Sequence, residues 1–211
     1  MKVVGWGLVI ETAGKDLQLG LLSDGKPVEG ILWDEPNQHS EKLVVYVQQL
    51  LQKAALDWKE VRYAVYHQGP GSHTGLRIGL AAIKAWALSL NWAVYPVPLM
   101  RVLYERGRLE NGNSGEIFTF WETRTDLWYG QLWSEKAPSQ AALLSRSEWE
   151  KRVAQALWVG NHPSAHYYVE KLPWSWIAHA ARTVQPLTTK ESIIGLVPLY
   201  FREFIPTQRK G

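Results

Sequence analysis

The spacing of apolar residues divides the first half of the chain into strand-like and helix-like segments. Val3–Glu11, Leu17–Leu22 and Gly30–Asp34 are short apolar runs separated by the turns AGKD and SDGKP. Such runs predict three strands joined as a meander. In Ser40–Ala55 the apolar residues recur at helical spacing, at Leu43, Val47, Leu50, Leu51 and Ala54. This segment therefore predicts an amphipathic helix, with Ser40 as its cap.

The alternation of strands and helices continues beyond the first helix. The patterns predict a strand, a helix, a strand and a short helix at Val61–His67, Gly75–Leu90, Ala93–Val97 and Leu99–Arg106. Three strands, a helix, a strand, a helix and a strand form the order of the ribonuclease-H-like half shared by actin, Hsp70 and sugar kinases. We predict residues 1–106 as one such lobe.

A polar segment, GRLENGNSG at residues 107–115, predicts the boundary with a second lobe at 107–211. The second lobe has weaker patterns. They predict a hairpin of Ile117–Glu122 with Trp128–Trp133 and a helix at Ser147–Ala156. They also predict a short strand at Leu157–Gly160 and a final helix at Thr189–Leu196. We interpret it as a smaller copy of the first. The predicted fold class is α/β, of the actin/Hsp70 type, with duplicated lobes in which helices flank mixed sheets.

Composition narrows the classes of function. The 211 residues contain no cysteine, which excludes disulfides, zinc–thiolate sites and thiol nucleophiles. The net charge is +3 and the basic residues are scattered, whereas a dedicated nucleic-acid binder has a clustered basic stripe. The first apolar run is too short to span a membrane and has no signal-peptide cleavage pattern. We expect a cytoplasmic protein without membrane contact, with most of its 12 tryptophans in the core.

The stretch HQGPGSHTGLRIG, residues 67–79, joins a predicted strand to a predicted helix. Gly69, Gly71 and Gly75 would allow a phosphate to lie close to the backbone. Ser72, Thr74 and Arg77 would add hydrogen bonds to it. Alternatively, the glycines form only a tight corner. The spacing matches neither a Walker A loop nor the dinucleotide fingerprint. The loop is therefore either an anion or nucleotide site or a structural turn.

Other candidate chemistry is sparse. His162 and His166 have the spacing of a metal-binding pair on a helix, but Pro163 lies between them, and we interpret them as loop histidines. Glu11 ends the first predicted strand, where actin-like proteins carry a magnesium-organising carboxylate, although a lone glutamate there is more often a hydrogen-bonding group. We predict no catalytic residue and no metal site.

The segment Gly69–Ala87, GPGSHTGLRIGLAAIKAWA, closely resembles the signature of the TsaB family (older name YeaZ), GPGSFTGLRIG followed by a helix of small residues. Three more segments resemble the family in the same order: His39–Leu43, Trp121–Trp133 and Val197–Glu203. The chain departs from the family pattern in three places. It has Glu11-Thr12-Ala13-Gly14 where the family has Asp-Thr-Ser-Thr, and Glu122-Thr123-Arg124 where the family has Asp-Ala-Arg. It has His73 where phenylalanine is common.

The resemblance implies a role in making threonylcarbamoyladenosine at position 37 of tRNAs that read ANN codons. It implies a non-catalytic scaffold subunit that dimerises with the catalytic relative TsaD and engages the ATPase TsaE. The chain by itself would require no cofactor, with ATP or ADP acting at the level of the complex. It would contact tRNA only through the complex and form a homodimer when alone.

TsaD-like enzymes carry two metal-ligating histidines four residues apart in the helix after the third strand. Here His39 is present, but the residue four positions later is Leu43, so half of that histidine pair is missing. We predict that the two long helices form the partner interface, through His39, Leu43, Val47, Gly79, Ala82 and Trp86. The alternative is a small ATP-dependent phosphotransferase or acyltransferase of the same fold, but the sequence shows no second phosphate loop.

Overall fold

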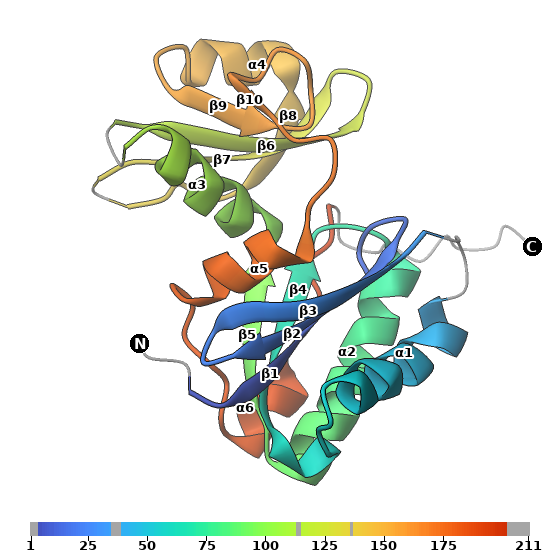
Figure 1. Ribbon diagram of the computed structural model, residues 1–211. Helices are drawn as coiled ribbons and strands as arrows, with labels where there is room; N and C mark the ends of the chain where they lie inside the picture. Colours follow the sequence, from blue (N-terminus) through green and yellow to red (C-terminus); the bar gives the residue numbers. More distant parts are fainter. Residues whose placement is uncertain (1–3, 35–38, 113–114, 136, 202–211) are drawn as a thin grey trace, which may run out of the picture.

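The computed structural model describes residues 4–34, 39–112, 115–135 and 137–201, and Figure 1 shows them arranged in two lobes. The first lobe is built on a five-stranded sheet of order β3-β2-β1-β4-β5. Its strands are β1 (Trp6–Glu11), β2 (Leu17–Ser23), β3 (Lys26–Trp33), β4 (Val61–Gly69) and β5 (Ala93–Pro98). The first three strands pair antiparallel, while β4 and β5 run parallel to β1. This confirms the predicted meander that leads into crossover units.

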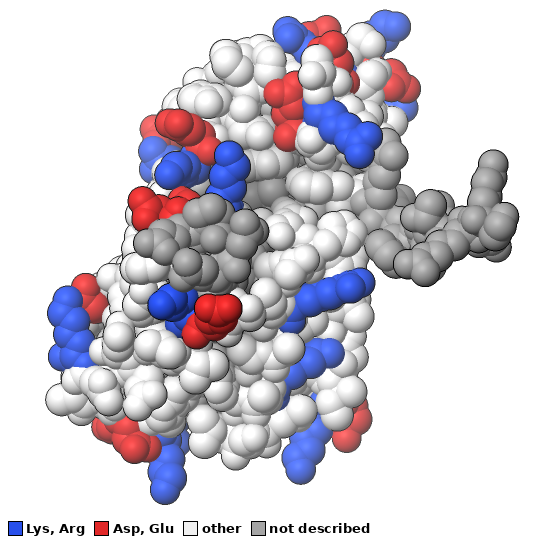
Figure 2. Space-filling view, turned by 90° about the vertical axis from the view of Figure 1, so that its right-hand side faces the viewer, with Lys and Arg blue, Asp and Glu red and all other residues white. Residues whose placement is uncertain are grey.

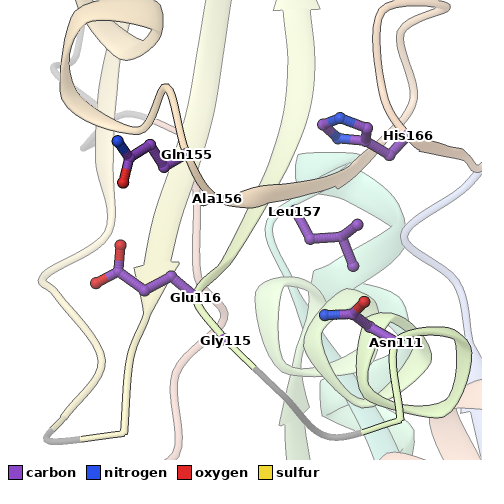
Figure 3. Close-up of a pocket in the computed structure, with 7 residues that line it drawn as sticks. All are labelled: Asn111, Gly115, Glu116, Gln155, Ala156, Leu157 and His166. Carbon is purple, nitrogen blue, oxygen red and sulfur yellow. The ribbon is translucent and has the colours of Figure 1, made fainter.

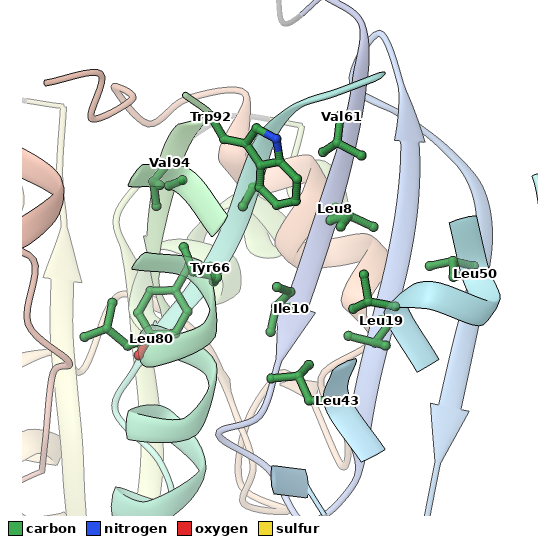
Figure 4. Close-up of a cluster of buried hydrophobic side chains, with 14 of the residues drawn as sticks. Leu8, Ile10, Leu19, Leu43, Leu50, Val61, Tyr66, Leu80, Trp92 and Val94 are labelled. Atoms are coloured by element: carbon green, nitrogen blue, oxygen red, sulfur yellow. The ribbon is translucent and has the colours of Figure 1, made fainter. Parts of the chain in front are cut away.

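Helices cover both faces of this sheet. The helices α1 (His39–Lys53) and α2 (His73–Leu90) pack on one face, and α5 (Trp174–Ala181) packs on the other. Residues along β1 alternate between the two cores: Leu8 and Ile10 belong to the cluster under α1 and α2, whereas Val9 belongs to the cluster under α5. Figure 4 shows the first cluster, with the side chains of the strands turned toward those of the helices. The alternation is the period of two that a strand imposes on its side chains.

The second lobe has a five-stranded sheet of order β10-β9-β6-β7-β8. Its elements are β6 (Ile117–Arg124), β7 (Leu127–Trp133), β8 (Ala142–Ser145), α4 (Arg146–Arg152), β9 (Leu157–Gly160) and β10 (Tyr167–Tyr168). The predicted hairpin is confirmed as β6 and β7, which pair antiparallel. The sequence patterns did not predict β8, β10 or α5, and they extended α4 to Ala156, whereas the helix ends at Arg152.

The helix α3 (Leu99–Glu110) runs between the lobes, and it corrects the predicted boundary. The polar segment from residue 107 was expected to be a linker, but its first residues continue the helix. Gly107 is buried: a Cβ there would lie 2.9 Å from Val159 and 3.2 Å from Ile117. The contact with the second sheet therefore extends the helix beyond Arg106.

The predicted starts of two elements in the first lobe, its first strand and its first helix, also change. The first strand was predicted from Val3, which lies outside the described residues, and β1 begins at Trp6. Ser40 lies inside α1 rather than capping it, because the helix begins at His39. Among the helices of the described ranges, none is long and apolar enough to cross a membrane.

The last part of the described chain returns to the first lobe, which corrects the assignment of the final helix to the second. α5 contacts strands of the first sheet, and α6 (Lys190–Gly195) contacts α2. The Trp174 ring lies on Gly20 and Gly30, where an added Cβ would come within 2.1 Å and 2.5 Å of it. Because the two glycines have no side chains, the indole ring can pack directly against the backbone of the sheet at these positions. The predicted final helix itself is confirmed, with Thr189 as its N-cap.

Candidate functional site

The glycine-rich loop lies between the end of β4 and the start of α2. Ser72 is the N-cap of α2, and its Oγ accepts the N–H of Gly75 at 3.2 Å. The backbone N–H of Ser72 donates to the carbonyl of Ala13 at 2.8 Å, which ties the loop to the turn after β1. Gly69 has a φ of +98°, a conformation that favours glycine.

Three glycines bring α2 against the end of β1. A Cβ on Gly75 would lie 1.8 Å from the Thr12 carbonyl oxygen, and one on Gly79 would lie 2.4 Å from Thr12 Oγ1. A Cβ on Gly71 would lie 2.6 Å from Ala13. Packing therefore gives these glycines a structural role. Anion binding by the loop stays a prediction.

Arg77 and Thr74 lie on the first turns of α2. The Nε of Arg77 donates to the hydroxyl of Tyr200 at 3.2 Å, so part of its hydrogen-bonding capacity is used within the chain. Thr74 is exposed and lines the pocket described below.

A buried carboxylate–imidazole pair lies next to the loop. Glu11 ends β1, His67 lies near the end of the neighbouring parallel strand β4, and Glu11 Oε2 is in contact with His67 Nδ1. The two residues are 2% and 4% exposed. Glu11 Oε1 accepts the N–H groups of Ala13 at 2.5 Å and Gly14 at 2.9 Å. His67 Nε2 has no hydrogen-bond partner among the described residues.

Tyr66, next to His67, is part of the same buried region. Its hydroxyl donates to the carbonyl of Leu76 at 2.9 Å. Burial raises the pKa of Tyr66 far above its ordinary value, with smaller contributions from Tyr200 and Glu11. The tyrosine therefore stays neutral and acts as a hydrogen-bond donor to α2.

A pocket of about 920 Å³ lies between the lobes and includes this pair in its lining. Ser72, Thr74 and Gly75 line it from the start of α2, and Trp121 lines it from the second lobe. Such a crevice at the carboxyl ends of parallel strands is where α/β proteins place ligands. A carboxylate–imidazole pair can exchange a proton with a bound group. The sequence interpretation considered Glu11 but missed His67, although the adjacency of β1 and β4 in the predicted fold places the two strand ends together.

A second pocket, of about 260 Å³, lies in the second lobe and is shown in Figure 3. Gln155 and Glu116 lie on one side of it, and Asn111 and His166 lie on the other. His166 Nδ1 accepts the backbone N–H of Trp158 at 2.9 Å. These mixed polar groups form no recognisable catalytic set.

The two spaced histidines do not act together. His166 is bound to the backbone of Trp158, whereas His162 Nδ1 lies 2.8 Å from the Ser164 hydroxyl. Within the described ranges, no group of three or more His, Asp or Glu side chains could hold a metal ion. Separate local hydrogen bonds thus account for both rings.

Three of the six predicted interface residues are buried in the first lobe itself. Leu43 and Val47 are 1% and 0% exposed, and Gly79 lies against Thr12. Ala82 and Trp86 are half-buried on α2, and His39 begins α1. Core packing leaves the first three no surface for a partner, so any interface on these helices must use neighbouring positions.

Comparisons with known proteins find matches to the TsaD family model and to TsaB proteins. The model of the TsaD family, tRNA N6-adenosine threonylcarbamoyltransferase, matches residues 34–126. The TsaB protein of Bacillus subtilis (strain 168), named for tRNA threonylcarbamoyladenosine biosynthesis, is 26% identical over 152 residues, which are 72% of this chain and 63% of that protein. The TsaB of Escherichia coli (strain K12) is 24% identical over 136 residues, 59% of this chain and 58% of that protein. The matches thus span less than two thirds of either relative.

In sequence and in fold, the chain is similar to proteins of the TsaB (YeaZ) family.

A solved structure from Pseudomonas aeruginosa, described as an uncharacterized protein with similarity to peptidase YeaZ, has the same fold as this TsaB relative. It matches with a TM-score of 0.71 at 20% identity and covers 94% of this chain and 100% of that chain. The predicted fold class, with two lobes and mixed sheets flanked by helices, is therefore confirmed.

Proposed function

We propose that this TsaB relative is a non-catalytic scaffold subunit in tRNA threonylcarbamoyladenosine biosynthesis. It would pair with a TsaD homologue and, in that complex, engage the ATPase TsaE to modify adenosine 37 of tRNAs that read ANN codons. The names of the curated relatives support the pathway. The outer face of α1, where two exposed valines and three exposed glutamines accompany a single glutamate, Glu41, is the observation that carries the scaffold role.

That outer face combines valines and glutamines. Val44 and Val45 are 49% and 48% exposed, and Gln48, Gln49 and Gln52 are also exposed on α1. Figure 2 views the side of the molecule that carries α1 and α2, and it shows a broad uncharged area on the lower lobe with charged side chains mainly around it. An apolar area with a polar border is typical of a protein interaction site.

The neighbouring helix suits close packing against a partner. α2 lies beside α1 and exposes Ala81 and Ala85, whose small side chains let another helix approach. Trp86 is half-buried on the same helix and offers an aromatic anchor of the kind enriched at interfaces. The proposed interface is therefore Val44 and Val45 on α1 with Ala81, Ala85 and Trp86 on α2.

Burial of Leu43 supports a role without metal chemistry. Leu43 is 1% exposed and packs in the core beneath α1. The position four residues after His39 is thus committed to the core, and the metal-dependent step would belong to the TsaD subunit. ATP or ADP would act in the complex rather than on this chain alone.

Co-expression with the TsaD homologue of the same organism tests the proposal. We expect the two chains to elute together in size-exclusion chromatography and to support threonylcarbamoylation of tRNA when TsaE is added. Val44→Glu with Val45→Glu should abolish co-elution and modification. Leu109→Glu is the matched control, because Leu109 is 60% exposed on α3, away from α1. The proposed surface would be contradicted if both variants still eluted together with TsaD, or if both failed to do so.

The chain alone provides two further readouts. We expect a homodimer that the two valine substitutions convert to a monomer, since the same face would pair in the absence of TsaD. We also expect no salt-dependent tRNA binding by the isolated chain, because tRNA would be contacted only through the complex. Tight, salt-dependent binding would favour a direct tRNA-binding role instead.

The second candidate is a small phosphotransferase or acyltransferase, and the pocket with Glu11 and His67 is the observation that favours it. Purified chain would then hydrolyse ATP or transfer a group without partners, and Glu11→Gln would abolish that activity. Absence of turnover by the isolated chain, together with full activity of the complex containing Glu11→Gln, would exclude this candidate.

A further inference from the structure

The pocket between the lobes has the size and openness of a small-molecule site. Its volume of about 920 Å³ lies within the range that ligand pockets occupy. Gly14, Ser40 and Thr74 line it and are exposed, so a solute can enter from the solvent. The chemistry of the lining then decides which solute fits.

The buried pair of Glu11 and His67 sets the polar requirement of this pocket. Glu11 Oε1 accepts two backbone N–H groups, and Oε2 contacts His67 Nδ1. Because a carboxylate oxygen only accepts hydrogen bonds, the proton of the neutral imidazole lies on Nδ1, and Nε2 is left as an acceptor. His67 lines the pocket with a side chain that is 5% exposed, and its Nε2 has no partner among the described residues. Such a buried acceptor is usually satisfied by water or by a ligand, which here must offer an O–H or N–H donor.

Apolar side chains form much of the remaining wall. Leu99, Leu172 and Phe201 line the pocket, together with Trp121 of β6. The Trp121 ring is half-buried and stacks on no other aromatic ring within the ranges that the structure describes. An indole favours contact with another flat ring in an offset or edge-on arrangement. The wall therefore accepts a flat apolar group in the same pocket as the polar pair.

The charges of the lining favour a neutral ligand. Three carboxylates line the pocket, those of Glu11, Asp16 and Glu170, against two lysines, Lys15 and Lys171. Lys171 already pairs with Asp16 at 3.3 Å. The lining therefore has no excess of positive charge that would draw an anion such as a nucleotide phosphate.

We propose that this pocket binds a neutral small molecule that joins a flat ring to a hydroxylated group, with one hydroxyl donating to His67 Nε2 and the ring packing on Trp121. Nucleosides and aryl glycosides both have this chemistry. Neither contact belongs to the interface proposed on α1 and α2, so ligand binding is independent of the scaffold role and can be tested on the chain alone.

Isothermal titration calorimetry of the full chain tests the proposal with adenosine, phenyl β-D-glucoside and AMP. We expect saturable binding of adenosine or of the glucoside, and the tighter of the two identifies the ligand class. If adenosine binds, AMP should bind more weakly, because its phosphate brings negative charge to a lining that already has more carboxylates than lysines. Trp121→Ala should weaken binding by about tenfold, as expected for the loss of a stacking contact. Trp176→Ala is the matched control: Trp176 is half-buried on α5 under Arg106 and does not line the pocket, so binding should be unchanged.

Nuclear magnetic resonance of the six histidines, labelled with ¹⁵N, tests the polar contact without a substitution. We expect the ring proton of His67 on Nδ1 and a change in its Nε2 signal on addition of the probe that binds. His166 is the internal reference: its Nδ1 accepts the N–H of Trp158, so its proton should lie on Nε2 and its signals should not respond. Absence of saturable binding by both neutral probes, tighter binding of AMP than of adenosine, or a proton on His67 Nε2 would each overturn the proposal. So would equal weakening of binding by Trp121→Ala and Trp176→Ala.

Discussion

Glu11 faces the imidazole of His67 across two neighbouring parallel strands, and both side chains are almost fully buried. The register pairs Ile10 with Tyr66, so the next residue on each strand meets its counterpart. The turn after β1 supplies two more N–H donors to the same carboxylate. A buried polar group of this kind depends on all of its partners, because each lost partner leaves an unsatisfied group away from water.

Removal of either member of the Glu11–His67 pair should destabilise the protein strongly. We expect Glu11→Leu and His67→Leu each to lower the free energy of unfolding by about 3 kcal/mol, since each leaves the other polar side chain buried without its partner. The double variant should cost about 1 kcal/mol less than the sum, because neither polar side chain of the pair is then left facing an apolar replacement. Urea denaturation measures all three variants.

A surface pair provides the control for this cycle. Glu110→Gln removes the partner of Arg106 on α3, where the two side chains are 30% and 35% exposed. This substitution should cost less than about 1 kcal/mol. Additive effects of the two substitutions at Glu11 and His67 would show that the contact contributes no coupling energy.

Gly79→Ala should destabilise the protein although alanine is the better helix former. The added methyl would lie 2.4 Å from Thr12 Oγ1, so α2 or β1 must shift, at a cost of about 1–3 kcal/mol. Thr12→Ala in the same chain removes the clashing oxygen and should restore part of the loss. Thermal denaturation, followed by circular dichroism, compares the variants.

Gly195 in α6 is the matched control for Gly79, because a Cβ there meets no atom within 4 Å. Gly195→Ala should be neutral or stabilise by up to about 1 kcal/mol, as expected from helix propensity alone. If Gly79→Ala proved as harmless as Gly195→Ala, the close approach of α2 to Thr12 would not constrain that position.

The protein should lose stability between pH 10 and 12. Tyr63 is buried, and desolvation raises its pKa from 10.0 to about 12. The unfolded chain then releases the proton first, so the contribution of Tyr63 is complete below pH 10 and is lost as the pH rises through about 12. We expect about 1.4 kcal/mol per pH unit from this group. Tyr63→Phe should make the decline shallower by that amount.

Tyr168 tests whether burial is the cause of the alkaline decline. It is 54% exposed on β10, so Tyr168→Phe should leave the slope unchanged. Comparison of slopes between variants cancels the lysines, which titrate in the same range. A slope for Tyr63→Phe that equals the wild-type slope in urea denaturation would contradict the assignment.

Local patterns determined much of the first lobe. The turns and apolar runs before Ser40 predicted the three-stranded meander, and the helical spacing of Leu43 and Val47 predicted the buried side of α1. These features depend on residues close in sequence, whose periodicity records which side faces the core. The glycines before α2 predicted either a phosphate site or a tight corner, but their contacts with Thr12 and Ala13 were not predicted.

Only the tertiary structure decided the contacts between distant segments. Trp174 docks on Gly20, more than half the chain away, and this contact brings α5 back to the first lobe. The meeting of Glu11 with His67 depends on the same long-range folding, through the pairing of β1 with β4. A periodic pattern specifies which face of an element is buried but not which distant element covers it, so these contacts could not be derived from the sequence alone.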